Sequence, residues 1–206
     1  MAVLCISRQF GAGGKTLGES VAKRLGYEFM DECMLDQLAE KADVWLDSPA
    51  PSNGDLHERL TAVLGAFCPV DFVERILGDQ PQPANEQKHL ESLARIIREL
   101  AAIGNVVLLG RGGQFILRHN PDTIKVLLVA SQEHRLEFLV RHYQLSEADA
   151  KRLINEADRK RGRFLNNFYP GEPDEASLYH LVLNTSKLTL ATAEDQVVSL
   201  VQRMFE

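Results

Sequence analysis

Short apolar runs alternate with amphipathic stretches along most of the chain. The runs at residues 106–109 and 124–129 are rich in β-branched side chains, as in strands that a parallel sheet buries on both faces. Apolar residues at helical spacing separate such runs. The pattern predicts strands at 3–6, 27–30, 106–109, 124–129 and 181–183, and helices at 15–25, 32–42, around 90–100, 132–142, 147–165 and 192–204. This alternation predicts a three-layer α/β fold whose ligands bind at the carboxyl ends of the strands.

One stretch interrupts the alternation. Residues 48–54 and 78–83 are rich in Pro, Gly and polar residues, which is typical of loops, and residues 55–77 between them have a mixed helical pattern. The span 48–88 is therefore predicted to be a helical insertion over a nucleotide-sized cleft.

The composition is that of an ordinary globular domain. The 206 residues are 45% hydrophobic, and 23 Lys and Arg against 29 Asp and Glu give a formal net charge of −6, which argues against broad nucleic-acid binding. No apolar run approaches the roughly 20 residues that span a bilayer. The three cysteines are widely spaced and favour a reducing compartment. We expect a cytoplasmic protein with no nucleic-acid or membrane partner.

A glycine loop lies between the first predicted strand and the first predicted helix. Glycines let backbone N–H groups converge on an anion, the helix N-terminus adds partial positive charge, and a Lys neutralises phosphate charge. Gly14-Lys15-Thr16 fits the second half of the P-loop pattern, but the first glycine of that pattern would fall at Gln9. The alternative is a plain glycine turn with Lys15 exposed in the first turn of the helix.

Several segments together resemble the cytidylate kinase-like family, a branch of the P-loop nucleoside monophosphate kinases. In chain order they are Ile6 to Gly14, Ala22 to Gly26 with Asp31, Gly110 to Gly113, Asp158 with Arg161, and Leu178 to Ser186. The resemblance implies one domain with a three-layer P-loop NTPase fold and a five-stranded parallel sheet. Its core would cover about 1–43 and 93–206, with a helical monophosphate-binding insertion at about 44–92 and a helical lid at about 151–170.

The resemblance also implies an activity and site residues. ATP and Mg²⁺ would serve phosphoryl transfer to CMP or dCMP, and the ATP phosphates would be surrounded by Gly11, Ala12, Gly13, Gly14, Lys15 and Thr16, with Thr16 also holding Mg²⁺. Asp31 would lie beside the acceptor nucleotide, and Arg111 would clamp its phosphate. Arg161, with Arg159 or Arg163, would close from the lid onto the transferring phosphoryl group. Positioning and charge stabilisation dominate such catalysis, so no nucleophile or general base is required of the protein.

Each of these assignments has a structural alternative. Residues 151–163 contain six basic residues against Glu156 and Asp158, which also fits a solvated helix face with i,i+4 ion pairs. Asp31 would equally cap the helix predicted from about residue 32. The glycines around Arg111 would equally form a tight turn with an exposed arginine.

Two departures from the family pattern bear on catalysis. In an ungapped alignment with an ordinary cytidylate kinase, Gly14 takes the place of the P-loop lysine and Arg8 that of the first glycine. The strand before Gly110 ends in Leu109 and lacks the Asp that helps to hold Mg²⁺ in related kinases. Either Lys15 still reaches the phosphates or Arg8 substitutes for the lysine. A kinase for CMP or dCMP is predicted, with a kinase for another small phosphate acceptor and an impaired nucleotide-binding protein as alternatives.

Overall fold

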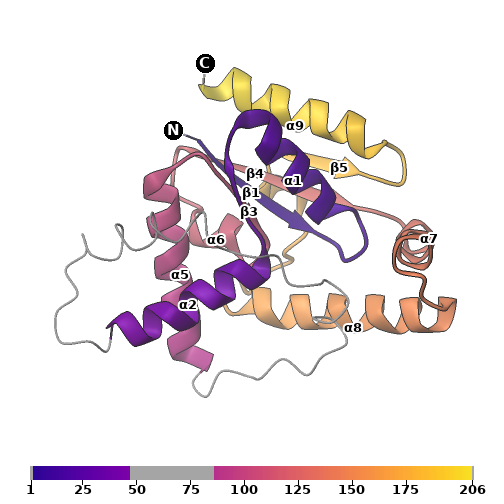
Figure 1. Ribbon diagram of the computed structural model, residues 1–206, viewed down its shortest axis with the longest axis horizontal. Helices are drawn as coiled ribbons and strands as arrows, with labels where there is room; N and C mark the ends of the chain where they lie inside the picture. Colours follow the sequence, from indigo (N-terminus) through magenta and orange to yellow (C-terminus); the bar gives the residue numbers. More distant parts are fainter. Residues whose placement is uncertain (1, 47–85, 206) are drawn as a thin grey trace.

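The computed structural model of the protein describes residues 2–46 and 86–205, and it describes residues 42–46 by their backbone alone. Strands and helices alternate along the chain (Figure 1). In order they are β1 (Val3–Arg8), α1 (Gly14–Leu25), β2 (Glu28–Met30), α2 (Glu32–Leu46), α5 (Glu86–Ile103), β3 (Val106–Leu109), α6 (Gly113–Ile116), β4 (Thr123–Val129), α7 (Gln132–Tyr143), α8 (Glu147–Asn166), the short 3₁₀ helix η2 (Ala176–Leu178), β5 (Leu181–Asn184) and α9 (Leu190–Phe205).

The five strands form one parallel sheet in the order β2-β3-β1-β4-β5. The central strand is β1, in which Ile6 lies opposite Leu109 of β3 and Val126 of β4. Since all strands run the same way, the carboxyl ends of β1, β2 and β3 meet at one edge of the sheet. That edge is where a fold of this kind binds ligands, as the sequence predicts.

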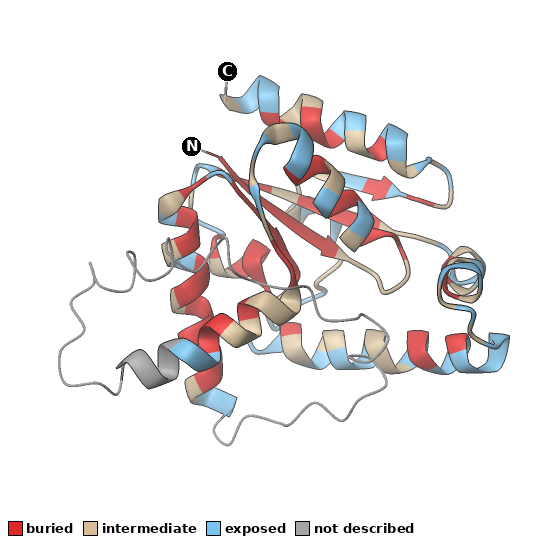
Figure 2. Ribbon diagram, in the orientation of Figure 1, coloured by how far each residue is buried: buried red, intermediate tan, exposed pale blue. Residues whose placement is uncertain are grey.

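Apolar clusters on the two faces of the sheet make up most of the core. Leu4 and Ile6 of β1 pack with α1 and α9 on one face, whereas Val3 and Cys5 pack with α2 and α5 on the other. Successive strand residues point to opposite faces, so a fully apolar run serves both clusters. Figure 2 shows the strands buried between the two helical layers. The three predicted layers are confirmed.

The predicted elements agree with the structure to within a few residues at most ends. The largest extensions are in α5, which covers Glu86–Ile103, and in α2, which continues to Leu46. Two elements were not predicted, α6 and η2, because four and three residues are too few to show a helical period. The predicted insertion at 48–88 lies almost wholly outside the described residues. Its last part is continuous with the core, since α5 runs without interruption from Glu86.

The helices α7 and α8 lie beside the carboxyl edge of the sheet (Figure 1). A small apolar cluster joins them, centred on Leu139, Ala150 and Ile154. The start of α8 is fixed by Ser146, whose hydroxyl accepts a hydrogen bond from the N–H of Asp149 at 3.1 Å. The cap confirms the predicted start of this helix.

Candidate functional site

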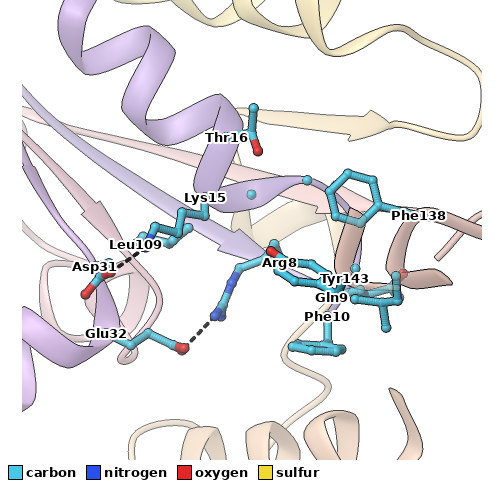
Figure 3. Close-up of a pocket in the computed structure, with 14 residues that line it drawn as sticks. Arg8, Gln9, Phe10, Lys15, Thr16, Asp31, Glu32, Leu109, Phe138 and Tyr143 are labelled. Atoms are coloured by element: carbon cyan, nitrogen blue, oxygen red, sulfur yellow. Dashed lines mark ion pairs between the residues drawn. The ribbon is translucent and has the colours of Figure 1, made fainter. Parts of the chain in front are cut away.

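A pocket opens at the carboxyl ends of β1, β2 and β3 (Figure 3). It is lined by Arg8, Gln9, Phe10, Gly11, Gly13, Gly14, Lys15, Thr16, Asp31, Glu32, Leu109, Phe138, Leu139 and Tyr143. The charged side chains gather at one end of the pocket and the aromatic ones at the other. Every residue predicted to surround the ATP phosphates lines this pocket except Ala12, which is buried in the loop.

The glycine loop takes a conformation that suits anion binding. Gly11 and Gly13 have positive φ angles of 84° and 79°, and a Cβ at Gly13 would lie 2.7 Å from a methyl group of Leu190. Gly13 is also the N-cap residue of α1, and among the described side chains none caps this helix. The uncapped N–H groups and the positive end of the helix dipole therefore meet at the pocket wall.

Contacts from outside the pocket fix the loop backbone. Arg135 donates a hydrogen bond to the carbonyl oxygen of Phe10, and the Thr185 hydroxyl donates one to that of Ala12, both at 3.2 Å. These two carbonyl oxygens would repel a phosphate, and their partners lie outside the pocket lining. The loop is therefore oriented before any ligand arrives.

Asp31 acts both as a helix cap and as an ion-pair partner. Its Oδ1 accepts hydrogen bonds from the N–H groups of Cys33 and Met34 at 3.0 and 3.1 Å, so it begins α2 as the capping alternative predicts. Its Oδ2 lies 3.4 Å from Nζ of Lys15. Lys15 also lies 3.9 Å from Glu19 on the same helix. The lysine therefore runs along the flank of α1 toward the end of β2 (Figure 3).

The neighbouring carboxylate, Glu32, holds Arg8. Nη2 of Arg8 lies 2.6 Å from Oε2 of Glu32. Burial alone would raise the pKa of Glu32, but the charges of Arg8 and Arg111 and the hydrogen bond from Arg8 outweigh it, so the pKa lies below its ordinary value. Glu32 is thus an ionised group under the influence of two arginines, one at the end of β1 and one in the turn after β3.

Arg111 sits in a tight turn directly after β3. Gly110, Arg111 and Gly112 all have positive φ, and the N–H of Gly113 donates to the Gly110 carbonyl at 3.3 Å, as in a type I′ turn. A non-glycine residue in this region is strained by on the order of 1 kcal/mol. Strain of this kind is typical of functional positions, and here it sets the direction in which the arginine leaves the sheet edge.

The guanidinium of Arg111 is packed and paired on several sides. It forms an ion pair with Asp36 of α2, and its centre lies 4.9 Å from the ring centroid of Phe164 in α8. Burial alone would lower the pKa of Arg111, but Glu32 and Asp36 outweigh it and keep the arginine charged. Within the described part of the chain, its buried Nε has no hydrogen-bond partner. Arg111 is therefore a fixed cation whose Nε–H makes no hydrogen bond to the described residues.

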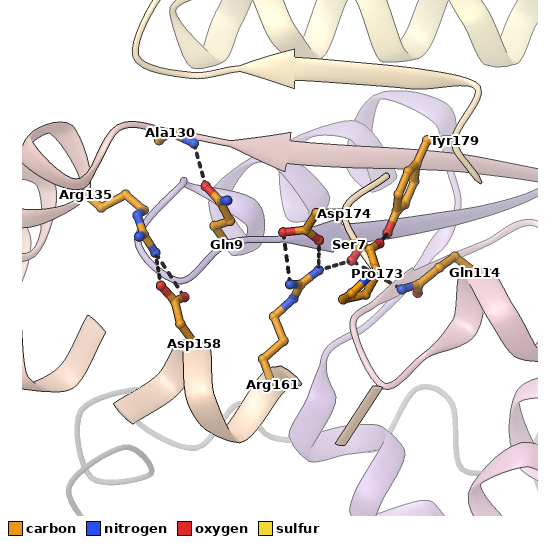
Figure 4. A network of polar contacts seen from close by, with 10 residues as sticks. All are labelled: Ser7, Gln9, Gln114, Ala130, Arg135, Asp158, Arg161, Pro173, Asp174 and Tyr179. Carbon is orange, nitrogen blue, oxygen red and sulfur yellow. Dashed lines mark hydrogen bonds and ion pairs between the residues drawn. The ribbon is translucent and has the colours of Figure 1, made fainter. Parts of the chain in front are cut away.

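Arg161 reaches the sheet edge from α8 (Figure 4). Its Nη2 donates to the hydroxyl of Ser7 at 2.9 Å, and both terminal nitrogens contact Asp174, at 2.5 and 3.2 Å. Burial raises the pKa of nearby Tyr179, which remains a neutral phenol and donates to the carbonyl of Pro173 at 2.6 Å. The predicted lid arginine is thus held next to β1.

The other lid basics are arranged differently. Arg159 and Arg163 are exposed, and Lys160 forms an exposed i,i+4 pair with Glu156 at 2.9 Å. The solvated-face alternative therefore describes part of the segment but not Arg161. A second link between α8 and the loop comes from Asp158, which accepts from Nη1 of Arg135 at 2.7 and 3.0 Å (Figure 4).

Several site residues were not singled out from the sequence: Ser7, Glu32, Asp36, Arg135 and Asp174. Glu32 could have been found from its position beside Asp31. The role of Asp36 had no local signal, because its partner Arg111 lies 75 residues away. The same holds for Arg135, which is 125 residues from the carbonyl it supports.

The comparison with known proteins decides the family. A family model described as the cytidylate kinase-like family matches residues 3–187. The chain belongs to this family. A cytidylate kinase of Pyrobaculum islandicum is 30% identical over 193 residues, which cover 94% of this chain and 89% of the relative. A cytidylate kinase of Methanopyrus kandleri is 33% identical over 113 residues, or 51% of this chain and 56% of the relative. The resemblance inferred from the motifs is confirmed.

Solved structures confirm the fold expected of the cytidylate kinase-like family. An uncharacterized protein from Eubacterium ventriosum aligns with a TM-score of 0.71 over 98% of this chain and 99% of its own. A gluconokinase from Sinorhizobium meliloti aligns with a TM-score of 0.54 over 98% and 93%. A shikimate kinase from Bacteroides thetaiotaomicron aligns with a TM-score of 0.51 over 98% of each chain. All three are 16% identical to this chain and therefore show the shared fold alone.

Two features are absent from residues 2–46 and 86–205, a cluster of metal-ligating side chains and a helix that could span a membrane. No three His, Cys, Asp or Glu side chains in these ranges are arranged to hold a metal ion. No helix in the same ranges combines the length and apolar character of a membrane span.

Proposed function

We propose that the protein transfers the γ-phosphoryl group of ATP to a pyrimidine nucleoside monophosphate, CMP or dCMP. Family membership and the two relatives named cytidylate kinase support the choice of reaction and acceptor. The observation that carries the proposal is that three arginines lie near the carboxyl ends of β1 and β3, of which Arg8 lines the pocket. Glu32 lies between Arg8 and Arg111, and Arg161 contacts Ser7, which precedes Arg8. Such a cluster stabilises the charge of a transferring phosphoryl group.

The glycine loop would hold the ATP phosphates. Its uncapped helix N-terminus and the cations of Arg8 and Lys15 supply the positive charge. Thr16 lines the pocket in the first turn of α1, where its hydroxyl would be a ligand for Mg²⁺ arriving with the nucleotide. The ion would neutralise phosphate charge when bound.

Arg111 and Asp31 would receive the acceptor. Arg111 follows β3 directly in a tight turn, and a guanidinium suits the binding of a phosphate. Asp31 caps the start of α2 and forms an ion pair with Lys15, between the proposed ATP and acceptor sites. In this proposal both residues would orient the acceptor toward the glycine loop.

Arg161 would act on the transferring group from α8. In the structure Arg161 forms an ion pair with Asp174. Movement of the guanidinium to the phosphoryl group would exchange the Asp174 carboxylate for the phosphate as its anionic partner. The exposed Arg159 and Arg163 are the lid cations that would accompany it. We expect Arg161→Ala to lower kcat far more than ATP affinity, since the contact is made chiefly in the transition state. Equal losses in both would count against this role.

The test is transfer of label from γ-labelled ATP, with Mg²⁺, to CMP, dCMP, UMP, AMP and GMP, beside a control without acceptor. We expect rapid labelling of CMP or dCMP. Labelling of another acceptor would support the alternative of a kinase for a different small phosphate acceptor. ATP binding without labelling of any of them would favour an impaired nucleotide-binding protein, which the Gly14 and Leu109 departures also suggest.

A further inference from the structure

We propose that Arg8 is the phosphate-binding cation of the glycine loop, in place of a lysine at position 14, and that Arg8 and Gly14 are an exchange pair in which each residue requires the other. The inference rests on the proposed function, because it assigns a residue within the same ATP site. It chooses between the two cations that the sequence leaves open, Arg8 and Lys15.

The backbone does not explain the glycine at position 14. Gly14 is the first residue of α1 and, unlike Gly11 and Gly13, it is not among the residues with positive φ. A glycine in a helix loses conformational entropy on folding and is disfavoured unless something requires it. The requirement at Gly14 therefore comes from a neighbouring side chain.

That neighbour is Arg8. A Cβ at residue 14 would lie 2.7 Å from Cγ of Arg8 and 3.1 Å from its Cβ and Cδ. These three atoms are the part of the side chain nearest the backbone, and β1 holds that backbone in the sheet. Cβ is fixed by the backbone, and Cγ and Cδ can move away only through a change of χ1 or χ2 that redirects the whole Arg8 side chain. The stem of Arg8 occupies the space in which a side chain at position 14 would begin.

The guanidinium of Arg8 ends in the charged part of the pocket. Its side chain is 15% exposed and lines the pocket beside Gly14 (Figure 3). Glu32 contacts one terminal nitrogen, Nη2, whereas a guanidinium has five N–H donors in a fork that matches phosphate oxygens. The ion pair thus orients Arg8 and leaves donors for a ligand. The Arg8 side chain passes through the space in which a side chain at position 14 would begin. We therefore expect the Arg8 guanidinium to bind the phosphates held by the same glycine loop.

Lys15 is placed less favourably. Its ammonium lies between Asp31 at 3.4 Å and Glu19 at 3.9 Å, on the flank of α1 and toward the acceptor end of the pocket. We therefore expect Lys15 to contribute to the general positive charge of the site rather than to the binding of the ATP phosphates themselves.

The test compares ATP binding by titration calorimetry and thermal unfolding in the parent and in Arg8→Met, Lys15→Met, Gly14→Lys and the double variant Arg8→Gly with Gly14→Lys. Arg24→Met is the matched control, because Arg24 pairs with Glu194 and Asp195 at the far end of α1. Inorganic tripolyphosphate is titrated as a second probe, which reports on phosphate binding without the nucleoside.

We expect Arg8→Met to weaken ATP and tripolyphosphate binding by about 10- to 100-fold, and Lys15→Met by less than about threefold. Gly14→Lys alone should unfold at a lower temperature and bind ATP weakly. The double variant should recover both the unfolding temperature and the ATP affinity, to within about threefold of the parent. Recovery by exchange separates a charge role from a merely structural one.

Parent-like ATP binding by Arg8→Met, with loss of binding in Lys15→Met, would overturn the inference and assign the phosphates to Lys15. A double variant as weak as Gly14→Lys would overturn the exchange pair. A folded parent that binds neither ATP nor tripolyphosphate would instead overturn the proposed function, so the two failures are distinguishable.

Discussion

The chain uses the same short pattern twice at the binding edge of the sheet. Gly11-Ala12-Gly13-Gly14 follows β1 and precedes α1, and Gly110-Arg111-Gly112-Gly113 follows β3 and precedes α6. The first segment becomes an open loop below a helix of 12 residues, whereas the second becomes a tight turn before a helix of four. The patterns are alike in sequence, but their structures provide different chemistry.

What separates the two segments is their distance from the sheet. Gln9 and Phe10 stand between β1 and the first glycine, whereas Gly110 continues the sheet by donating from its N–H to the carbonyl of Ile6 at 2.9 Å. The first segment can therefore open around an anion under a helix dipole. The second segment is a tight turn that cannot open around an anion. It instead sets the direction of one guanidinium, that of Arg111. The comparison suggests that the glycine loop serves the phosphate donor and the glycine turn serves the acceptor.

The largest expected effect comes from removing the charge of the glycine turn. Arg111→Met should lower kcat/KM for the acceptor by about 100- to 1,000-fold, because the cation proposed to bind the acceptor phosphate is lost. ATP affinity should stay within about threefold of the parent. Steady-state kinetics and calorimetry check this, with the exposed Arg118→Met as the control. A parallel loss of ATP affinity would mean that the two segments do not serve different substrates.

Alanine at one glycine of each segment should divide the effects between the two substrates. Gly13→Ala and Gly112→Ala both place a Cβ at positive φ and close to a neighbour, Leu190 at 2.7 Å or Phe168 at 2.8 Å. Each should lower the free energy of unfolding by at least about 1–2 kcal/mol. Gly13→Ala should mainly weaken ATP binding, and Gly112→Ala should mainly raise KM for the acceptor.

Gly26→Ala is the control for these two variants. Gly26 has a φ of 68°, but nothing lies within 4 Å of its Cβ position. It should show the conformational cost of positive φ, measured by urea unfolding, without a change in the affinity of either substrate. If Gly13→Ala and Gly112→Ala had the same substrate profile as each other, the proposed division would be wrong.

A smaller effect is expected at Asp31, which lies where the two segments meet. Asp31→Asn retains a side-chain oxygen that caps α2, so the unfolding free energy should change by only a few tenths of a kcal/mol, whereas Asp31→Ala should cost about 1 kcal/mol. Both variants lose the ion pair with Lys15 and should raise KM for the acceptor by about tenfold or less. An unchanged KM in Asp31→Asn would limit Asp31 to capping.

The smallest effect is a pH dependence at Glu32. This residue forms an ion pair with Arg8, just before the glycine loop, and lies against the position that a Cβ at Gly110 would occupy. Because the pKa of Glu32 lies below the ordinary value of 4.5, its ionised form stabilises the folded protein above that pH, and the contribution is lost as the pH falls below it. The parent should therefore exceed Glu32→Gln in stability at about pH 7 and exceed it by less at about pH 3. Urea unfolding at both values checks this, and a constant difference would contradict it.

Prediction from the sequence succeeded where the signal was local and repeated. Longer helices show their period in neighbouring positions, the strands appear as short apolar runs, and a glycine loop between strand and helix is visible in one short segment. It failed for α6 and η2, which are shorter than a helical period needs. It also could not choose between the cap and the ligand role of Asp31, and the structure shows one oxygen on the cap and the other facing Lys15.

The sequence by itself determined the parallel α/β architecture, the cytidylate kinase-like family and the segments that meet at the binding edge. The tertiary structure decided which polar groups contact each other there: Arg8 with Glu32, Arg111 with Asp36, and Arg161 with Ser7 and Asp174. The physical reason is that apolar periodicity is a pattern among neighbouring residues, whereas an ion pair or a hydrogen bond requires two groups to lie within a few ångströms although they can be 75 or 154 residues apart. Such distances exist only once the sheet has brought its strand ends together.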